Sequence, residues 1–186
     1  TAGEFELVDH DELRWLEIDQ LADMKWAPAD IPLMEQYQAR ASTVGYYSTN
    51  AVEYCEETSV FEVGDLYQPF LVHMTAGAHI LDLGCGAGRD SQAFRNMGYR
   101  VTSVDGSREI ADWASTFTGH RVTVQSFQDI DYWEDFDGVW ASASLLHCPR
   151  GQLPSVMDRI VTALKQDGFV YTSFKWGEGD SVDERG

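Results

Sequence analysis

Three glycines spaced by two, Gly84, Gly86 and Gly88, are the most chemically informative residues of this chain. They follow an apolar run, Ile80–Leu83, and precede a polar run that can open a helix. A strand, a tight glycine turn and a helix start bring a ligand close to bare backbone, because glycine accepts positive φ and carries no side chain. The segment therefore predicts a site for a nucleoside-containing cofactor.

Two common nucleotide motifs do not fit this turn. The dinucleotide fingerprint G-x-G-x-x-G requires a third glycine at the position of Arg89, so an NAD site is disfavoured. The phosphate-binding loop G-x-x-x-x-G-K-[ST] requires a Lys-Ser or Lys-Thr pair, and none follows these glycines. The pattern that remains is D-x-G-x-G-x-G, from Asp82 to Gly88.

This pattern resembles motif I of the class I S-adenosylmethionine (SAM)-dependent methyltransferases. The resemblance implies that the first carboxylate and the backbone of the turn hold the amino-acid half of SAM, through Asp82, Gly84, Cys85, Gly86 and Gly88. It also implies a ribose-binding carboxylate after the next strand.

Asp105, with Gly106 beside it, ends the expected strand Arg100–Asp105 and lies 21 positions after Gly84. That separation is close to the ~20 residues expected for a ribose-binding carboxylate in such a unit. A carboxylate accepts two charge-assisted hydrogen bonds from a vicinal diol. Asp105 is therefore the expected ribose ligand.

The segment after the third expected strand, Ser126–Ile130, corresponds to the adenine-flanking segment of the family. The resemblance implies that Asp129 meets the adenine amino group and that Phe127, Gln128 or Ile130 lies alongside the ring. A surface carboxylate in a loop is the alternative for Asp129.

Two further segments resemble parts of the family's site. The backbone carbonyls near Ala141 and Ser142 correspond to those that receive the ammonium of SAM, and Tyr47 or Tyr46 to an aromatic lid over the sulfonium. His147 is either a base facing the acceptor or a structural histidine, and we favour the structural role. No residue receives a catalytic assignment at this point.

Strand and helix signals alternate from residue 77 onward, which predicts a parallel sheet with helices on both faces. The expectation is a three-layer Rossmann-like α/β fold with strand order 3-2-1-4-5, lacking the last two strands of the family, and an N-terminal helical extension. The expected strands are His79–Leu83, Arg100–Asp105, Arg121–Gln125, Asp137–Ala143 and Phe169–Phe174, and the expected helices are Ser48–Thr58, Gly64–Met74, Asp90–Met97, Arg108–Phe117 and Gln152–Gln166.

The two ends depart from the family pattern. Residues 1–38 resemble the C-terminal tail of Nudix hydrolases, through Leu13–Leu16 and Trp26–Pro32, but the catalytic Nudix box is absent and we assign no hydrolase activity. We divide the chain into this extension, 1–40, and a C-terminally short methyltransferase domain, 41–186. The last strand would then be an exposed edge, which invites pairing with Phe5–Val8 or with a second copy in a homodimer.

The amino-acid composition limits the classes of partner that the protein can bind. Thirteen basic against 31 acidic residues give a net charge of −18, which disfavours nucleic acid and anionic membranes. No apolar stretch approaches ~18 residues, no signal peptide is visible, and three isolated cysteines indicate neither a metal site nor a disulfide framework. We expect a cytoplasmic location.

The tellurite-resistance-like, small-molecule branch of the family is the one that Gly-Arg-Asp at 88–90, Leu-Leu-His at 145–147 and Ser-Phe-Lys at 173–175 resemble most. The expected function is SAM-dependent methyl transfer to a small molecule. The alternative is a module that binds SAM or S-adenosylhomocysteine (SAH) without activity, because the short sheet leaves no acceptor site.

Overall fold

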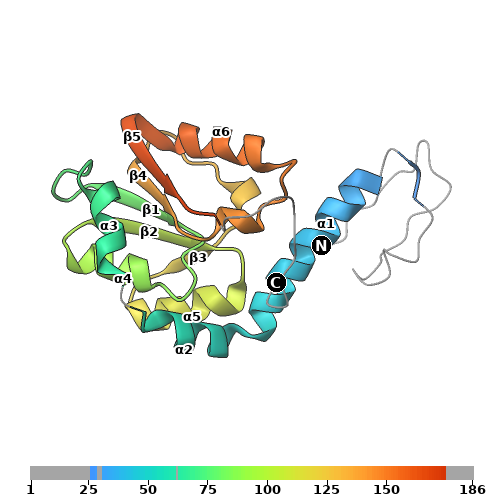
Figure 1. The fold of residues 1–186 in the computed structure, drawn as a ribbon, viewed down its shortest axis with the longest axis horizontal. Helices are drawn as coiled ribbons and strands as arrows, with labels where there is room; N and C mark the ends of the chain where they lie inside the picture. Colours follow the sequence, from blue (N-terminus) through green and yellow to red (C-terminus); the bar gives the residue numbers. More distant parts are fainter. Residues whose placement is uncertain (1–25, 29–30, 62, 175–186) are drawn as a thin grey trace, which may run out of the picture.

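A computed structural model of the chain describes residues 26–28, 31–61 and 63–174 (Figure 1). Its centre is a parallel sheet in the order β3-β2-β1-β4-β5, which confirms the predicted order. The strands are β1 His79–Leu83, β2 Arg100–Asp105, β3 Val122–Val124, β4 Phe136–Ala141 and β5 Leu164–Thr172. The α-helices are α1 Ile31–Thr49, α2 Ala51–Ser59, α3 Gly64–Leu71, α4 Arg89–Asn96, α5 Arg108–Thr118 and α6 Leu153–Ala163, with short 3-10 turns η2 Phe127–Asp129 and η3 Leu145–His147.

The sheet is covered on both faces because its central strands are apolar on both sides. One face carries Leu81 and Leu83 of β1 with Val139 of β4, and α6 packs there through Val156 and Ile160. The result is a three-layer sandwich, with α6 on one side of the sheet and α4 and α5 on the other (Figure 1).

The opposite face holds an aromatic cluster. Trp140 of β4 and Ile80 of β1 pack against Tyr67 and Phe70 of α3 and against Phe94 of α4. The alternation of side chains along a strand sends neighbours such as Ile80 and Leu81 to opposite layers. Both central strands are thereby fixed in register, and their carboxyl ends are brought together.

The local signals for the first elements were accurate. Strands His79–Leu83 and Arg100–Asp105 have the predicted bounds. Ser107 caps α5 as expected, since its hydroxyl accepts a hydrogen bond from the backbone N–H of Ile110 at 3.3 Å.

The predicted helix Gln152–Gln166 was too long at its C-terminal end. α6 ends at Ala163, and Leu164 already pairs with Phe136 in the sheet. An irregularity follows, in which Asp167 has a φ of 63° and Phe169 resumes the pairing opposite Gly138. A bulge within a strand carries no strong sequence signal, so the glycine at 168 was wrongly taken as the helix stop.

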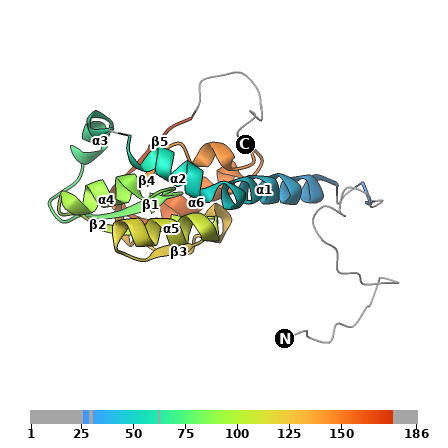
Figure 2. The ribbon, with the colours of Figure 1, turned by 90° about the horizontal axis from the view of Figure 1, so that it is seen from below.

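The helical segment before the sheet also differs from the prediction. The predicted helix Ser48–Thr58 is interrupted at Asn50, which separates α1 from α2. α1 extends away from the sheet, and its C-terminal end lies beside α2 and α5 (Figures 1 and 2). This places the end of α1 over the carboxyl ends of the strands.

Most of the predictions for the two chain ends concern residues outside the described part of the chain. Most of the Nudix-like segment, and Phe5–Val8 with it, lies outside the described residues. α1 runs through the predicted boundary at residue 40, and β5 is the end strand of the sheet within the described part. In that part, no helix has the length and hydropathy needed to cross a membrane.

Candidate functional site

A pocket lies at the carboxyl ends of the strands, beside the glycine turn. Its empty volume is about 730 Å³, open space at the mouth included. Six of the predicted site residues line it, namely Tyr47, Gly84, Gly86, Asp105, Gly106 and Gln128. This is the position at which ligands bind in open α/β sheets.

The glycine turn requires glycine at each of its three positions, but for different reasons. All three residues have positive φ, 74° at Gly84, 53° at Gly86 and 80° at Gly88. A Cβ at Gly84 would lie 2.6 Å from the Cβ of Ser144, and one at Gly88 would lie 2.6 Å from Thr118 Cγ2. Gly88 therefore allows α4 and α5 to approach, whereas Gly84 and Gly86 keep the pocket open.

Asp105 is joined directly to the glycine turn. Its carboxylate accepts a hydrogen bond from the backbone N–H of Gly86 at 3.0 Å and another from that of Ser107 at 2.9 Å. Burial raises the pKa of the Asp105 carboxyl, and the backbone N–H groups oppose this rise. A carboxylate has about four lone-pair positions, so Asp105 can still accept from a ligand such as a ribose hydroxyl.

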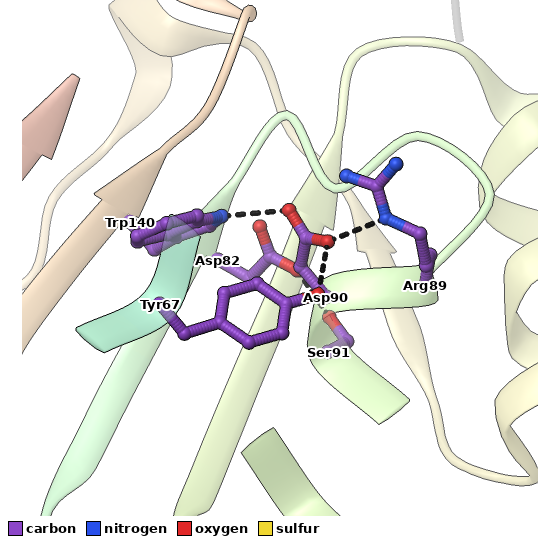
Figure 3. Close-up of polar contacts among 6 residues, drawn as sticks. All are labelled: Tyr67, Asp82, Arg89, Asp90, Ser91 and Trp140. Atoms are coloured by element: carbon purple, nitrogen blue, oxygen red, sulfur yellow. Dashed lines mark hydrogen bonds and ion pairs between the residues drawn. The ribbon is translucent and has the colours of Figure 1, made fainter. Parts of the chain in front are cut away.

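A second carboxylate, Asp90, organises the helices below the turn (Figure 3). It accepts hydrogen bonds from Tyr67 Oη at 2.8 Å, from Trp140 Nε1 at 2.8 Å and from Arg89 Nε at 2.7 Å. These donors come from α3, β4 and α4, so one buried carboxylate ties three elements together at the base of the site. The sequence offered no signal for this role.

Asp82 lies beneath the turn and not on the pocket wall. It is 2% exposed, and its carboxyl accepts a 2.5 Å hydrogen bond from the hydroxyl of Ser91, which also contacts Ser103. Burial, reinforced by the neighbouring Asp90 charge, raises the pKa of Asp82 to about 8. In this structure its side chain supports the turn from below.

Three predicted residues near the glycine turn and β4 also lie off the pocket wall. Cys85 packs against the α5 side of the sheet, and burial raises the pKa of its thiol well above the ordinary value. Ala141 is buried in the core under α6, and Ser142 follows it at the end of β4. β4 ends two residues earlier than predicted, so Ala143 and Ser144 line the pocket instead.

Only some residues of the predicted adenine-flanking segment, 126–130, line the pocket. Phe127 and Gln128 line the pocket, whereas Ile130 is buried in the core. Asp129 is exposed and lies off the wall, where its carboxylate accepts a hydrogen bond from Ser126. The tight turn η2 causes this separation, because it rotates successive side chains to different sides.

Ser144 is a candidate ligand-binding residue that the sequence analysis missed. It lines the pocket, is 4% exposed, and its hydroxyl has no hydrogen-bond partner among the described residues. An unpartnered buried hydroxyl is energetically unfavourable unless a ligand or water satisfies it. Serine after a strand gives no sequence signal by itself, so only its position identifies it.

Tyr47 and His147 meet across the pocket. A 2.9 Å hydrogen bond joins Tyr47 Oη to His147 Nε2, and the rings stack edge to face with centroids 5.2 Å apart. The ring centroid of Tyr54 lies 5.0 Å from that of Tyr47, and Tyr46, which also contacts Tyr47, does not line the pocket. The described residues contain no cluster of three or more His, Cys, Asp or Glu suited to a metal ion.

Comparison with known proteins supports the same interpretation. Residues 80–168 match the model of a family described as a methyltransferase domain. A ubiquinone biosynthesis O-methyltransferase of Xanthomonas axonopodis pv. citri is 33% identical over 100 residues, which are 50% of this chain and 41% of that protein. The chain thus spans about two fifths of the length of this curated relative.

Solved structures show the same fold. A 1,6-didemethyltoxoflavin-N1-methyltransferase of Burkholderia thailandensis, with bound 1,6-didemethyltoxoflavin and SAH, is 25% identical, with a TM-score of 0.56 over 79% of this chain and 64% of that one. A TehB-like SAM-dependent methyltransferase of Corynebacterium glutamicum is 22% identical, with a TM-score of 0.59 over 75% and 77%. The matched domain and the sheet order of this chain are thus those of methyltransferase structures, one of which is bound to SAH.

Proposed function

We propose that this chain binds SAM in the pocket beside the glycine turn and transfers the methyl group to a small-molecule acceptor. The observation that carries the proposal is the Asp105 carboxylate, held by the N–H groups of Gly86 and Ser107 at the edge of a pocket with bare glycine backbone. SAM supplies an electrophilic methyl group on a sulfonium. The chain binds and orients this group and excludes water from it.

Each part of the cofactor has a partner in this arrangement. Asp105 accepts hydrogen bonds from the ribose hydroxyls, and Phe127 with Gln128 lies against the adenine. The ammonium and carboxylate end lies over Gly84 and Gly86, within reach of the unpartnered hydroxyl of Ser144. The aromatic face of Tyr47 suits the sulfonium.

In-line methyl transfer gains chiefly from holding donor and acceptor in the reactive geometry, which contributes up to ~7–11 kcal/mol. The net charge of −18 disfavours polyanionic acceptors such as nucleic acid, which supports a small-molecule acceptor. The tellurite-resistance-like branch, the cytoplasmic location and a homodimer through the edge of β5 stay predictions. At 22% identity, the TehB-like structure bears on the fold alone.

Calorimetry with SAM and SAH tests the binding step. We expect Asp105→Asn to weaken binding by about tenfold to a hundredfold, since a hydrogen bond to a charged group contributes ~1.5–3 kcal/mol. Asp112→Asn, an exposed position on α5, is the matched control and leaves binding unchanged. Equal affinities of the two variants for SAM would show that Asp105 does not contribute to cofactor binding.

Transfer of a labelled methyl group from SAM to a panel of phenols, thiols and amines tests the chemical step. A methylated product with any acceptor supports methyltransferase activity of this chain. Binding of SAM without transfer to any of them favours the binding module instead. Absence of SAM binding contradicts both.

A further inference from the structure

The hydrogen bond between Tyr47 and His147 offers a chemical role beyond the contact of the Tyr47 ring with the cofactor. They come from positions 100 residues apart, α1 and the turn η3, yet both line the pocket and share a 2.9 Å hydrogen bond. The contact therefore depends on the folded arrangement of the two segments, and it lies on the wall of the pocket proposed to hold SAM.

Elimination among the pocket's ionisable side chains points to this pair as the route for a proton. In the described part of the chain, four such residues line the pocket: Tyr47, Tyr54, Asp105 and His147. The Asp105 carboxylate is engaged by two backbone N–H groups at the predicted ribose position. Burial raises the pKa of Tyr54, so its phenol stays protonated. Imidazole is the group whose ordinary pKa lies near neutrality.

The walls near the pair indicate the kind of acceptor. Val44 and Pro149, close in sequence to Tyr47 and His147, line the pocket together with the ring of Tyr47. Such a surface suits a flat, apolar molecule. A phenol fits these walls, and it must lose its proton for its oxygen to attack efficiently.

We propose that the acceptor is an aromatic hydroxyl and that Tyr47 and His147 remove its proton during methyl transfer. The acceptor oxygen bonds to the methyl carbon, and the carbon–sulfur bond breaks with its electron pair staying on sulfur, which yields SAH. The acceptor's proton passes to Tyr47 Oη while the phenolic proton of Tyr47 passes to His147 Nε2. The positive charge moves from the sulfonium to the imidazole, so atoms and charge balance. This inference rests on the proposed function.

The test compares two acceptors that differ in their need for a base. Phenol has a pKa of about 10, like tyrosine, whereas 4-nitrophenol is largely ionised at about pH 8. We expect Tyr47→Phe and His147→Gln to slow methylation of phenol by about 10²-fold or more, the scale of general-base catalysis. Methylation of 4-nitrophenol by the same variants falls by less than about threefold, because no proton has to be removed.

Matched variants and a binding measurement control the experiment. Tyr99→Phe changes a tyrosine that packs against the aromatic cluster, off the pocket wall, and His73→Gln changes an exposed histidine that stacks on Phe169. Both leave the two rates unchanged. SAH binding measured by calorimetry stays within about threefold of wild type for Tyr47→Phe and His147→Gln, because the first change keeps the aromatic ring and the second changes a residue that acts on the acceptor.

The outcomes separate the two proposals. Equal losses on the two phenols, or no loss on either, would assign the pair a structural role and overturn this inference. A wild-type chain that binds SAM and methylates thiols or amines, but neither phenol, overturns it as well and leaves the proposed function intact. A chain that does not bind SAM contradicts both.

Discussion

Substitution of Gly88 by alanine tests the reasoning about the glycine turn most directly, because two separate effects can be worked from the structure. The φ of Gly88 is 80°, and placing a residue with a Cβ in this left-handed region lowers the free energy of unfolding by ~1–2 kcal/mol. The new Cβ would also lie 2.6 Å from Thr118 Cγ2 and 3.3 Å from the Cβ of Ala114. Forcing such an overlap in a packed interior costs ~1–3 kcal/mol, so we expect a total loss of ~2–5 kcal/mol.

Gly119 provides a matched control. Its φ is 66°, it also borders a helix, and no atom lies within 4 Å of the position its Cβ would take. Gly119→Ala should therefore lower the free energy of unfolding only by the cost of the left-handed backbone, ~1–2 kcal/mol. Urea unfolding followed by circular dichroism and tryptophan fluorescence measures both values.

A double-mutant cycle isolates the contact itself. Thr118→Ser removes Cγ2 and keeps the hydroxyl that donates to the backbone carbonyl of Ala114 at 2.7 Å. In that background, Gly88→Ala should lose less than it does in the wild type, with a coupling of ~0.5–3 kcal/mol. If Gly88→Ala is no more destabilising than Gly119→Ala, or if Thr118→Ser gives no rescue, the packing explanation for this glycine is wrong.

Two further predictions concern the carboxylates beneath the turn. The pKa of Asp82 is raised from 3.8 to about 8 in the folded state, so the folded chain binds this proton more tightly than the unfolded chain, and Asp82 lowers the stability as the pH rises through that range. Asp82→Asn should flatten this part of a pH series of urea unfolding, and an unchanged slope would contradict the burial argument. Trp140→Phe keeps the aromatic packing but removes the Nε1 donor to Asp90. We expect the free energy of unfolding, measured in urea, to fall by ~1–3 kcal/mol. An unaltered unfolding midpoint would show that Asp90 does not need this donor.

The sequence was sufficient for features that depend on neighbouring residues. The glycine spacing, the two strands that flank it and the cap at Ser107 reflect local backbone preferences, and the structure has them where predicted. The alternation of strands and helices predicted a parallel sheet, and the resemblance to the methyltransferase family supplied its strand order. Local signals were weaker where the chain is irregular, as at the bulge before Phe169.

The tertiary structure alone decided which side chains face the pocket. The sequence placed Asp82, Ile130 and Ala141 at the correct ends of the strands, yet their side chains point into the interior. The side to which a residue points depends on the exact end of its strand and on the helix packed over it, and neither is encoded locally.

The contact of Tyr47 with His147 shows the same limit most clearly. Each residue is an ordinary aromatic in its own segment, and nothing between them in the sequence marks them as partners. They meet because the end of α1 packs beside α5, over the carboxyl ends of the strands, where η3 follows β4. The backbone of the cofactor turn was thus predictable from short-range chemistry, whereas the pairing across the pocket required the packing of distant elements.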